Sequence, residues 1–494
     1  MSQQPPHSRR QLDHQRSPES VANFSDGDLP GPDLPGPNLS ELGSMPLGRR
    51  RMLLGSLMLG AGILGGCGRS PQQVALRLGA VTGTIPARLP GAFLKHVRSL
   101  SPTELALELT PDLVRFAVEV ESLSSSQAIA ENLLKWQDLA KASAKALTET
   151  SEKEETPLAI TLPRLPSWVP FVGHQEVVPS DLVLLGDRWL SLARREKWIQ
   201  PLGMKLSPEA RGAIADDRWG PVMAGTADQE QGQAVWGMPY RWGTTVLVYR
   251  KDKVDEMGGP ITDWSDLWRS QLRGKVILLD RAREVVGATV KSLGGSYNVA
   301  NLDEVDGLGD RLAELHQQVL FYGSTDYLQP LLMGDAWVAM GWSRDVLPIL
   351  PRRSQLAAVV PQSGSALWAD LWVRPRETGA TEKGQSQTQT SQTLPKTSDK
   401  ETFDKTLAEL QQAWVEFCWT PDIARRVTLQ TTGASPQFLR GEWGDLAKDN
   451  RGSSSDRIRF PQGPTLANCE FLLPLSSQTR GQYRSLWTGL GTLE

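Results

Sequence analysis

Short apolar runs alternate with segments of helical pattern through most of this chain, and this alternation constrains the fold more than any other feature. Runs typical of buried strands lie at 74–78, 181–185, 244–249, 275–279, 336–340 and 357–361. Helical patterns occupy 88–97, 126–147, 284–293, 306–319, 403–419 and 421–429. Strands separated by helices in this way predict an α/β sheet rather than a sandwich or a helical bundle.

Two polar segments interrupt this pattern. Residues 148–156 are charged and polar, and residues 377–400 are rich in Ser, Thr and Gln with almost no apolar side chains. Such segments cannot bury apolar area, so both are expected to be solvated loops, the second as a low-complexity insertion.

Charge and cysteine content exclude several classes of protein. Lys and Arg number 53 against 56 Asp and Glu, so the formal charge of −3 gives no support for binding nucleic acid. Three cysteines and five scattered histidines rule out a disulfide scaffold and predict neither a metal site nor a cofactor. The sequence leaves open whether Cys418 and Cys469 form a disulfide.

The first 66 residues are predicted to be a leader and a signal peptide. Residues 1–44 have a disordered composition, and a basic cluster at 48–51 then precedes an apolar stretch of about 15 residues, shorter than the ~20 that span a bilayer. The segment Leu64-Gly-Gly-Cys67 resembles a lipobox, in which the cysteine is acylated, and Arg49-Arg50 resembles a twin-arginine export signal. An ordinary thiol at Cys67 is the alternative.

Motifs for catalysis are missing, whereas tryptophan is abundant. No nucleotide loop, Gly-x-Ser-x-Gly elbow or His-Glu-x-x-His pattern occurs, so an enzyme is not expected. Among 17 tryptophans, Trp242, Trp342 and Trp368 lie at the ends of predicted strands, where α/β sheets bind ligands. An indole beside a carboxylate can hold a cationic amine, although burial in the core would also explain these residues.

From about Val74 onward, apart from the two polar segments, the chain resembles periplasmic solute-binding proteins of ABC transporters, most of all the spermidine/putrescine-binding branch. The matching motifs, in family order, are 238–253, 263–268, 280–288, 292–298, 340–343, 367–370 and 419–427. The resemblance implies two α/β lobes joined by hinge-crossing strands, with the ligand in a cleft between them. Lobe 1 would comprise 74–242 and 370–440, and lobe 2 would comprise 243–369 and 441–494.

The resemblance also implies the ligand-binding residues. Glu284 and Asp370 match carboxylates that bind ligand ammonium groups, Trp342 and Trp368 match aromatic walls, and Thr82 matches a threonine after the first strand. Residues 470–474 lie near the position of a further contact.

Two arginines depart from the family pattern. Arg281 stands where the family has an acid, and Arg344 follows the cleft tryptophan where a small residue is common. An acid-to-arginine change alters the local charge by two units and disfavours a polycation unless Arg281 points away or pairs with Glu284.

The function implied is that of a monomeric, lipid-anchored periplasmic protein that binds a small amine-containing, polyamine-like solute. It would be attached to the membrane through Cys67 and deliver the solute to ABC permease subunits in the inner membrane. One alternative is a zwitterionic or anionic solute bound through Arg281. Another is a sensor or scaffold lipoprotein without a role in transport.

Overall fold

The computed structural model describes residues 72–100, 114–151, 179–226, 234–376, 397–448, 454–461 and 463–491. The leader, the signal peptide, Cys67 and residues 377–396 lie outside these ranges. Within the described ranges, no helix has the length and apolar character needed to cross a membrane.

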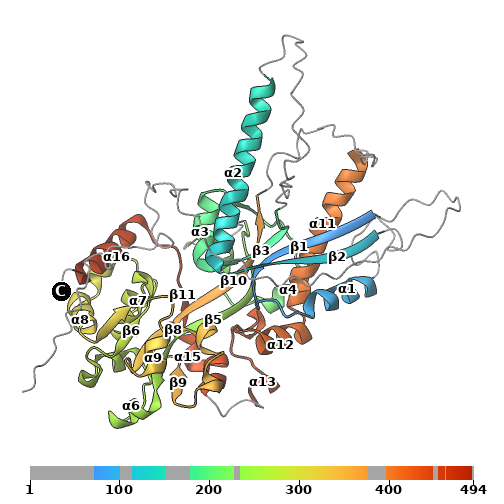
Figure 1. The fold of residues 1–494 in the computed structure, drawn as a ribbon. Helices are drawn as coiled ribbons and strands as arrows, with labels where there is room; N and C mark the ends of the chain where they lie inside the picture. The colour runs from blue at the N-terminus through green and yellow to red at the C-terminus, as the bar shows by residue number, and fades with distance from the viewer. Residues whose placement is uncertain are drawn as a thin grey trace, which may run out of the picture.

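Two long antiparallel strands, β5 (Met238–Arg250) and β10 (Ala366–Pro375), run through the middle of a mixed sheet of eleven described strands (Figure 1). On one side lie β1 (Gln72–Val81), β2 (Val114–Leu123) and β3 (Leu182–Gly186); on the other lie β6 (Val276–Leu278), β7 (Val319–Tyr322) and β8 (Val338–Trp342). The shorter strands are β4 (Ile199–Gln200), β9 (Leu356–Val359) and β11 (Glu470–Phe471).

Helices cover both faces of the β1–β3 part of the sheet, which explains why β3 is apolar throughout. Leu182 and Leu184 belong to one buried cluster, whereas Val183 and Leu185 belong to the other. The first cluster includes residues of α1 (Leu89–Ser99), α11 (Thr397–Cys418) and α12 (Pro421–Gln430); the second includes residues of α2 (Ser126–Ser151) and α3 (Asp187–Arg195). Two short helices, α4 (Pro208–Ala213) and α5 (Trp219–Ala224), complete this part.

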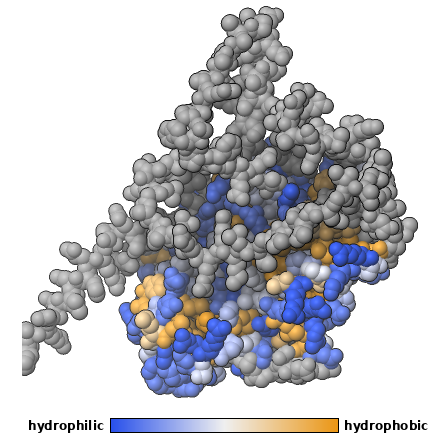
Figure 2. Space-filling view, turned by 45° about the vertical axis from the view of Figure 1, so that its right-hand side comes forward, coloured by the Kyte–Doolittle hydropathy of each residue, from blue (hydrophilic) through white to orange (hydrophobic). Residues whose placement is uncertain are grey.

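The other half of the molecule packs mainly around α7 (Ala282–Ser292), which contacts α8 (Leu308–His316) and the late helix α16 (Ser477–Leu490) (Figure 1). The remaining helices here are α6 (Lys251–Glu256), α9 (Gln329–Met333), α10 (Ser343–Val346), α13 (Asp445–Lys448), α14 (Ser454–Arg459) and α15 (Gly463–Ala467). Short 3-10 turns include Trp264–Trp268, Ser270–Leu272, Leu302–Glu304, Leu350–Arg352 and Pro436–Phe438. On the face shown in Figure 2, apolar patches of the described surface lie between hydrophilic ones.

The α/β architecture predicted from the sequence is thus observed, with corrections at the polar segments. Helix α2 continues to Ser151 and α11 begins at Thr397, so 148–151 and 397–400 are helical rather than loop. Residues 148–151 form the end of α2 and residues 397–400 form the start of α11. Both helices are amphipathic, and buried apolar residues such as Trp136 in α2 and Trp414 in α11 hold them against the rest of the protein. Cys418 and Cys469 are both buried and free, so they form no disulfide.

Helix α7 packs its middle against Tyr297, and we predict that this contact requires Gly287. A Cβ on Gly287 would overlap the buried Tyr297 ring. Gly287→Ala should therefore lower the free energy of unfolding by about 1–3 kcal/mol, although alanine favours a helix. Gly309→Ala in α8 has open space around it and should be neutral or stabilising by up to about 1 kcal/mol. Urea denaturation of both variants checks this, and equal midpoints would contradict it.

Candidate functional site

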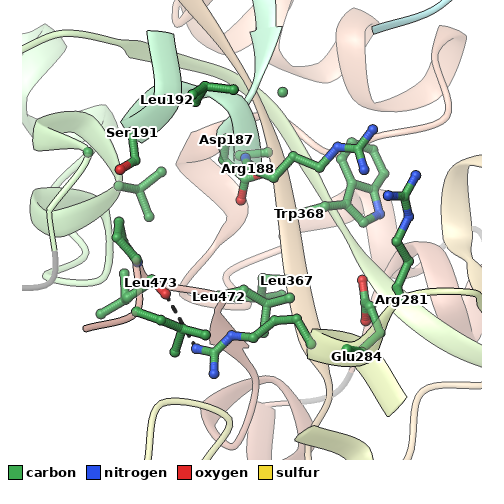
Figure 3. A pocket seen from close by; sticks show the side chains of 18 of the residues that line it. Asp187, Arg188, Ser191, Leu192, Arg281, Glu284, Leu367, Trp368, Leu472 and Leu473 are labelled. Carbon is green, nitrogen blue, oxygen red and sulfur yellow. Dashed lines mark hydrogen bonds between the residues drawn. The ribbon is translucent and has the colours of Figure 1, made fainter. Parts of the chain in front are cut away.

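A cavity of about 210 Å³ lies against the crossing strands, and both halves of the sheet contribute to its wall. From one half come Asp187, Arg188, Ser191 and other residues of α3, which follows directly after β3. From the other half come Asp280–Glu284 before and at the start of α7, after β6. These positions follow the carboxyl ends of strands, where open α/β sheets bind ligands. Figure 3 shows Arg188 and Arg281 both extending toward Trp368 of β10.

Four of the six ligand-binding residues predicted from the sequence line this one cavity: Arg281, Glu284, Trp342 and Trp368. Arg281, whose orientation the sequence left open, therefore lies in the cavity wall. Thr82 is exposed, its hydroxyl donates to the carbonyl of Leu123 at 3.2 Å, and it is not among the residues that line the cavity. Contact of any of these residues with a ligand stays a prediction.

Asp370 lies beside the cavity but is occupied by a buried partner. Its Oδ2 accepts a hydrogen bond of 2.7 Å from Nε of Arg241, which stands directly opposite on β5. Side chains of both residues are at most 7% exposed. The Arg241 guanidinium neutralises this carboxylate within the core between the two crossing strands. Asp370 is not among the residues that line the cavity. The sequence reasoning missed Arg241, although it stands within the 238–253 motif.

The carboxylate of Glu284 is also engaged by its neighbours. One oxygen accepts from the Thr245 hydroxyl at 2.9 Å and the other from Nε1 of Trp342 at 3.0 Å. Glu284 is 8% exposed, so these bonds form away from bulk water and hold the indole of Trp342 in place.

Both tryptophan walls carry a guanidinium from the chain itself. The Arg344 guanidinium carbon lies 4.8 Å from the Trp342 ring centroid and 5.4 Å from that of Trp368. Both distances are within the ~6 Å range of cation–π attraction. The Arg344 guanidinium therefore lies over both indoles that the resemblance assigned as aromatic walls.

Arginine predominates among the charged residues of the cavity. Its acids are Asp187, Asp280 and Glu284, whereas its arginines are Arg188, Arg195, Arg281, Arg283, Arg344 and Arg480. Arg283 donates to the Tyr483 hydroxyl at 2.7 Å, to Oδ1 of Asn298 at 2.8 Å and to the Leu473 carbonyl. Those three acceptors are uncharged, so they leave the positive charge of Arg283 in place.

Apolar side chains form the rest of the wall. Leu472, Leu473 and Pro474, from the segment noted in the sequence near a further contact, line the cavity together with Leu367 and Leu192 (Figure 3). Residues 186–188 also line it. The site thus joins a cluster of guanidinium groups to an apolar surface.

The pKa of Asp187 is raised to about 7, mainly by burial and to a smaller extent by the nearby Asp370 carboxylate, while hydrogen bonds from the backbone of Ala369 and Arg188 lower it. At neutral pH this acid is therefore partly protonated, and it neutralises less of the arginine charge than an ordinary aspartate would.

Comparisons with known proteins show which proteins this chain resembles. Residues 174–389 match the family described as "Bacterial extracellular solute-binding protein", a family of binding proteins rather than enzymes. The Spermidine/putrescine-binding periplasmic protein of Escherichia coli is 28% identical over 140 residues, 28% of this chain and 40% of that protein. The Putrescine/cadaverine-binding protein of Pseudomonas aeruginosa is 24% identical over 262 residues, 51% of this chain and 65% of that protein. The matched region thus spans about 40% of the first relative's length and about two thirds of the second's.

Solved structures show the same fold. The substrate-binding protein of a spermidine/putrescine ABC transporter from Streptococcus pneumoniae superimposes with a TM-score of 0.55 at 16% identity, covering 85% of this chain and 99% of that one. A cyclic maltosyl-maltose binding protein from Arthrobacter globiformis gives 0.50 at 10% identity, covering 85% and 93%. The resemblance and the two-lobed α/β fold predicted from the sequence are confirmed.

We predict that removing one partner of the Arg241–Asp370 pair destabilises the fold, because the other partner is left as an unpaired buried charge. Arg241→Met should lower the free energy of unfolding by about 3–5 kcal/mol, because it leaves the Asp370 carboxylate buried without its partner. Lys253→Met removes an exposed ion pair with Glu256 and should cost less than about 1 kcal/mol. Chemical denaturation measures both. The double variant Arg241→Met/Asp370→Asn should recover part of the loss, and no recovery would contradict the charge explanation.

The raised pKa of Asp187 predicts a pH dependence of stability. Between about pH 4 and pH 7 the folded state keeps a proton that the unfolded state has released, so the free energy of unfolding falls as pH rises. Asp187→Asn keeps the hydrogen-bond acceptor but removes the titration. It should reduce this slope and leave only a smaller slope below about pH 6 from Asp181, whose pKa burial raises to about 6. The variant should exceed the parent in stability at pH 8 by roughly 1–3 kcal/mol. Unfolding measured from pH 5 to 8 tests this, with the exposed Asp306→Asn as the control that keeps the parent slope.

Proposed function

We propose that this chain, which is similar over residues 174–389 to bacterial extracellular solute-binding proteins, binds a small solute in its cavity and delivers it to an ABC permease. The single observation that supports this most is the cavity wall, which residues on both sides of the crossing strands build together. A solute bound there contacts both lobes and favours their closure about β5 and β10. The protein acts as a binding component and performs no chemistry on the solute.

The lobes we propose are 74–242 with 370–440, and 243–369 with 441–494. Strands β1–β3 then fall in lobe 1 and β6–β9 in lobe 2, while β5 and β10 each pass from one lobe to the other. Helix α16, late in the chain, packs on α7 and α8, which supports placing 441–494 with lobe 2.

We further propose that the protein is exported and held at the periplasmic face of the membrane by acylation of Cys67. The support is the basic and apolar segment before Gly65-Gly66-Cys67 and the Arg49-Arg50 pair. The relatives bind spermidine, putrescine or cadaverine according to their names, so a polyamine-like amine is the solute that resemblance suggests for this chain.

Solute binding is tested by thermal unfolding of the purified full chain with putrescine, spermidine, amino acids, small carboxylates, phosphorylated compounds and sugars. A bound solute at 100 times its dissociation constant should add about 2.7 kcal/mol to the free energy of unfolding. Calorimetry then gives the affinity. Stabilisation by none of these compounds would contradict solute binding and favour a sensor or scaffold lipoprotein.

Matched variants show whether a stabilising solute sits in the cavity. Ser191→Trp places an indole into the cavity from α3 and should abolish the response. Ser270→Trp places the same side chain at an exposed position and should leave the response unchanged. A response that survives in Ser191→Trp would place the solute elsewhere.

A further inference from the structure

We propose that the solute held in this cavity carries an anionic group, a carboxylate or a phosphate, which the arginine cluster binds beside an apolar surface. The inference rests on the proposed function of the same site and names its substrate class. It differs from the polyamine that the resemblance suggests, and three features of the described residues support it.

The first feature is the filled aromatic position. Cation–π attraction contributes about 0.5–2 kcal/mol when a cation lies over an indole. Here the Arg344 guanidinium already lies over both Trp342 and Trp368, at 4.8 and 5.4 Å. A ligand ammonium would have to displace this charge or approach it closely, whereas a carboxylate or phosphate can hydrogen-bond to its edge.

The second feature is that the carboxylates expected to bind ammonium groups are engaged within the protein. Asp370 forms its buried ion pair with Arg241, and both oxygens of Glu284 accept hydrogen bonds from Thr245 and Trp342. An amine therefore gains less from either acid than it would from a carboxylate facing the cavity.

The third feature is net charge. Six arginines and three acids line the cavity, and burial holds one of those acids, Asp187, partly protonated at neutral pH. Glu196 and Asp345, outside the lining, pair with Arg195 and Arg344 at 3.0 and 3.7 Å, which leaves four lining arginines against the three acids. In a partly desolvated space such an excess repels a polycation and attracts an anion. The planar guanidinium also matches the geometry of carboxylate and phosphate groups through paired N–H donors.

The apolar part of the wall indicates the rest of the solute. Leu472 and Leu473 lie across from the arginines that extend toward Trp368, and Leu192 lies one turn after Arg188 on α3 (Figure 3). A small organic anion with a few carbon atoms fits both surfaces of this cavity of about 210 Å³.

The test compares anions with polyamines on the purified full chain by thermal unfolding and calorimetry. The anionic probes are inorganic phosphate, glycerol 3-phosphate, citrate and glutamate, and the cationic probes are putrescine and spermidine. We expect at least one anion to stabilise the protein, more strongly at low than at high salt, and neither polyamine to do so. The phosphate and carboxylate arms distinguish the two kinds of head group.

Two variants connect the response to the arginines. Arg344→Gln should weaken anion binding by about tenfold or more, whereas Arg353→Gln, exposed and outside the cavity lining, should leave it unchanged. Arg281→Asp should also weaken anion binding and create a response to spermidine, which loss of folding could not produce.

Each other outcome is decisive. Stabilisation of the parent protein by a polyamine, without any anion, would overturn the anionic class and leave the solute-binding function standing. Anion binding that is equal in Arg344→Gln, Arg281→Asp and Arg353→Gln would overturn the role of the arginine cluster. Silence from every probe would overturn both proposals together.

Discussion

The buried ion pair between Arg241 and Asp370 fixes the register of the two strands that cross this molecule, and the cavity depends on that register. Arg241 stands opposite Asp370, and two residues further along the pair of strands Gly243 stands opposite Trp368. Gly243 has no side chain, so the Trp368 indole can lie across β5 at that point. A slip of one residue would turn Trp368 to the other face and remove this part of the cavity wall. A buried ion pair adds little to net stability, but it strongly disfavours wrong pairings.

Local patterns predicted much of this architecture because the information lies within short segments. Helix α7 and the residues Arg281 and Glu284 at its start come from one contiguous motif, and β6 before it is a plain apolar run. Strand β2 was missed because Arg115, Glu119 and Glu121 interrupt its apolar residues, as suits a strand at the edge of the sheet. The pairing of Arg241 with Asp370 joins residues 129 positions apart, and no local pattern could reveal it.

The site shows how a retained motif can serve altered chemistry. Trp342, Trp368 and Glu284, which the resemblance proposed as ligand contacts, line one cavity. Their surroundings differ, because Arg344 and Arg281 bring two positive charges to the same wall. The sequence showed both substitutions as departures, but the contact of Arg344 with two indoles from different strands appears only in three dimensions. These neighbouring charges are what support the proposal of an anionic solute.

The two buried cysteines have a consequence for how the chain can be produced. Cys418 and Cys469 belong to different hydrophobic clusters, and burial raises the thiol pKa of Cys469 to about 11 and that of Cys418 well above its usual value. Thiolate is the species that attacks disulfides and oxidants, so both sulfurs react slowly in the folded protein. The described fold needs no cross-link to form. These described residues can therefore fold under reducing conditions and keep both thiols free when the surroundings become oxidising.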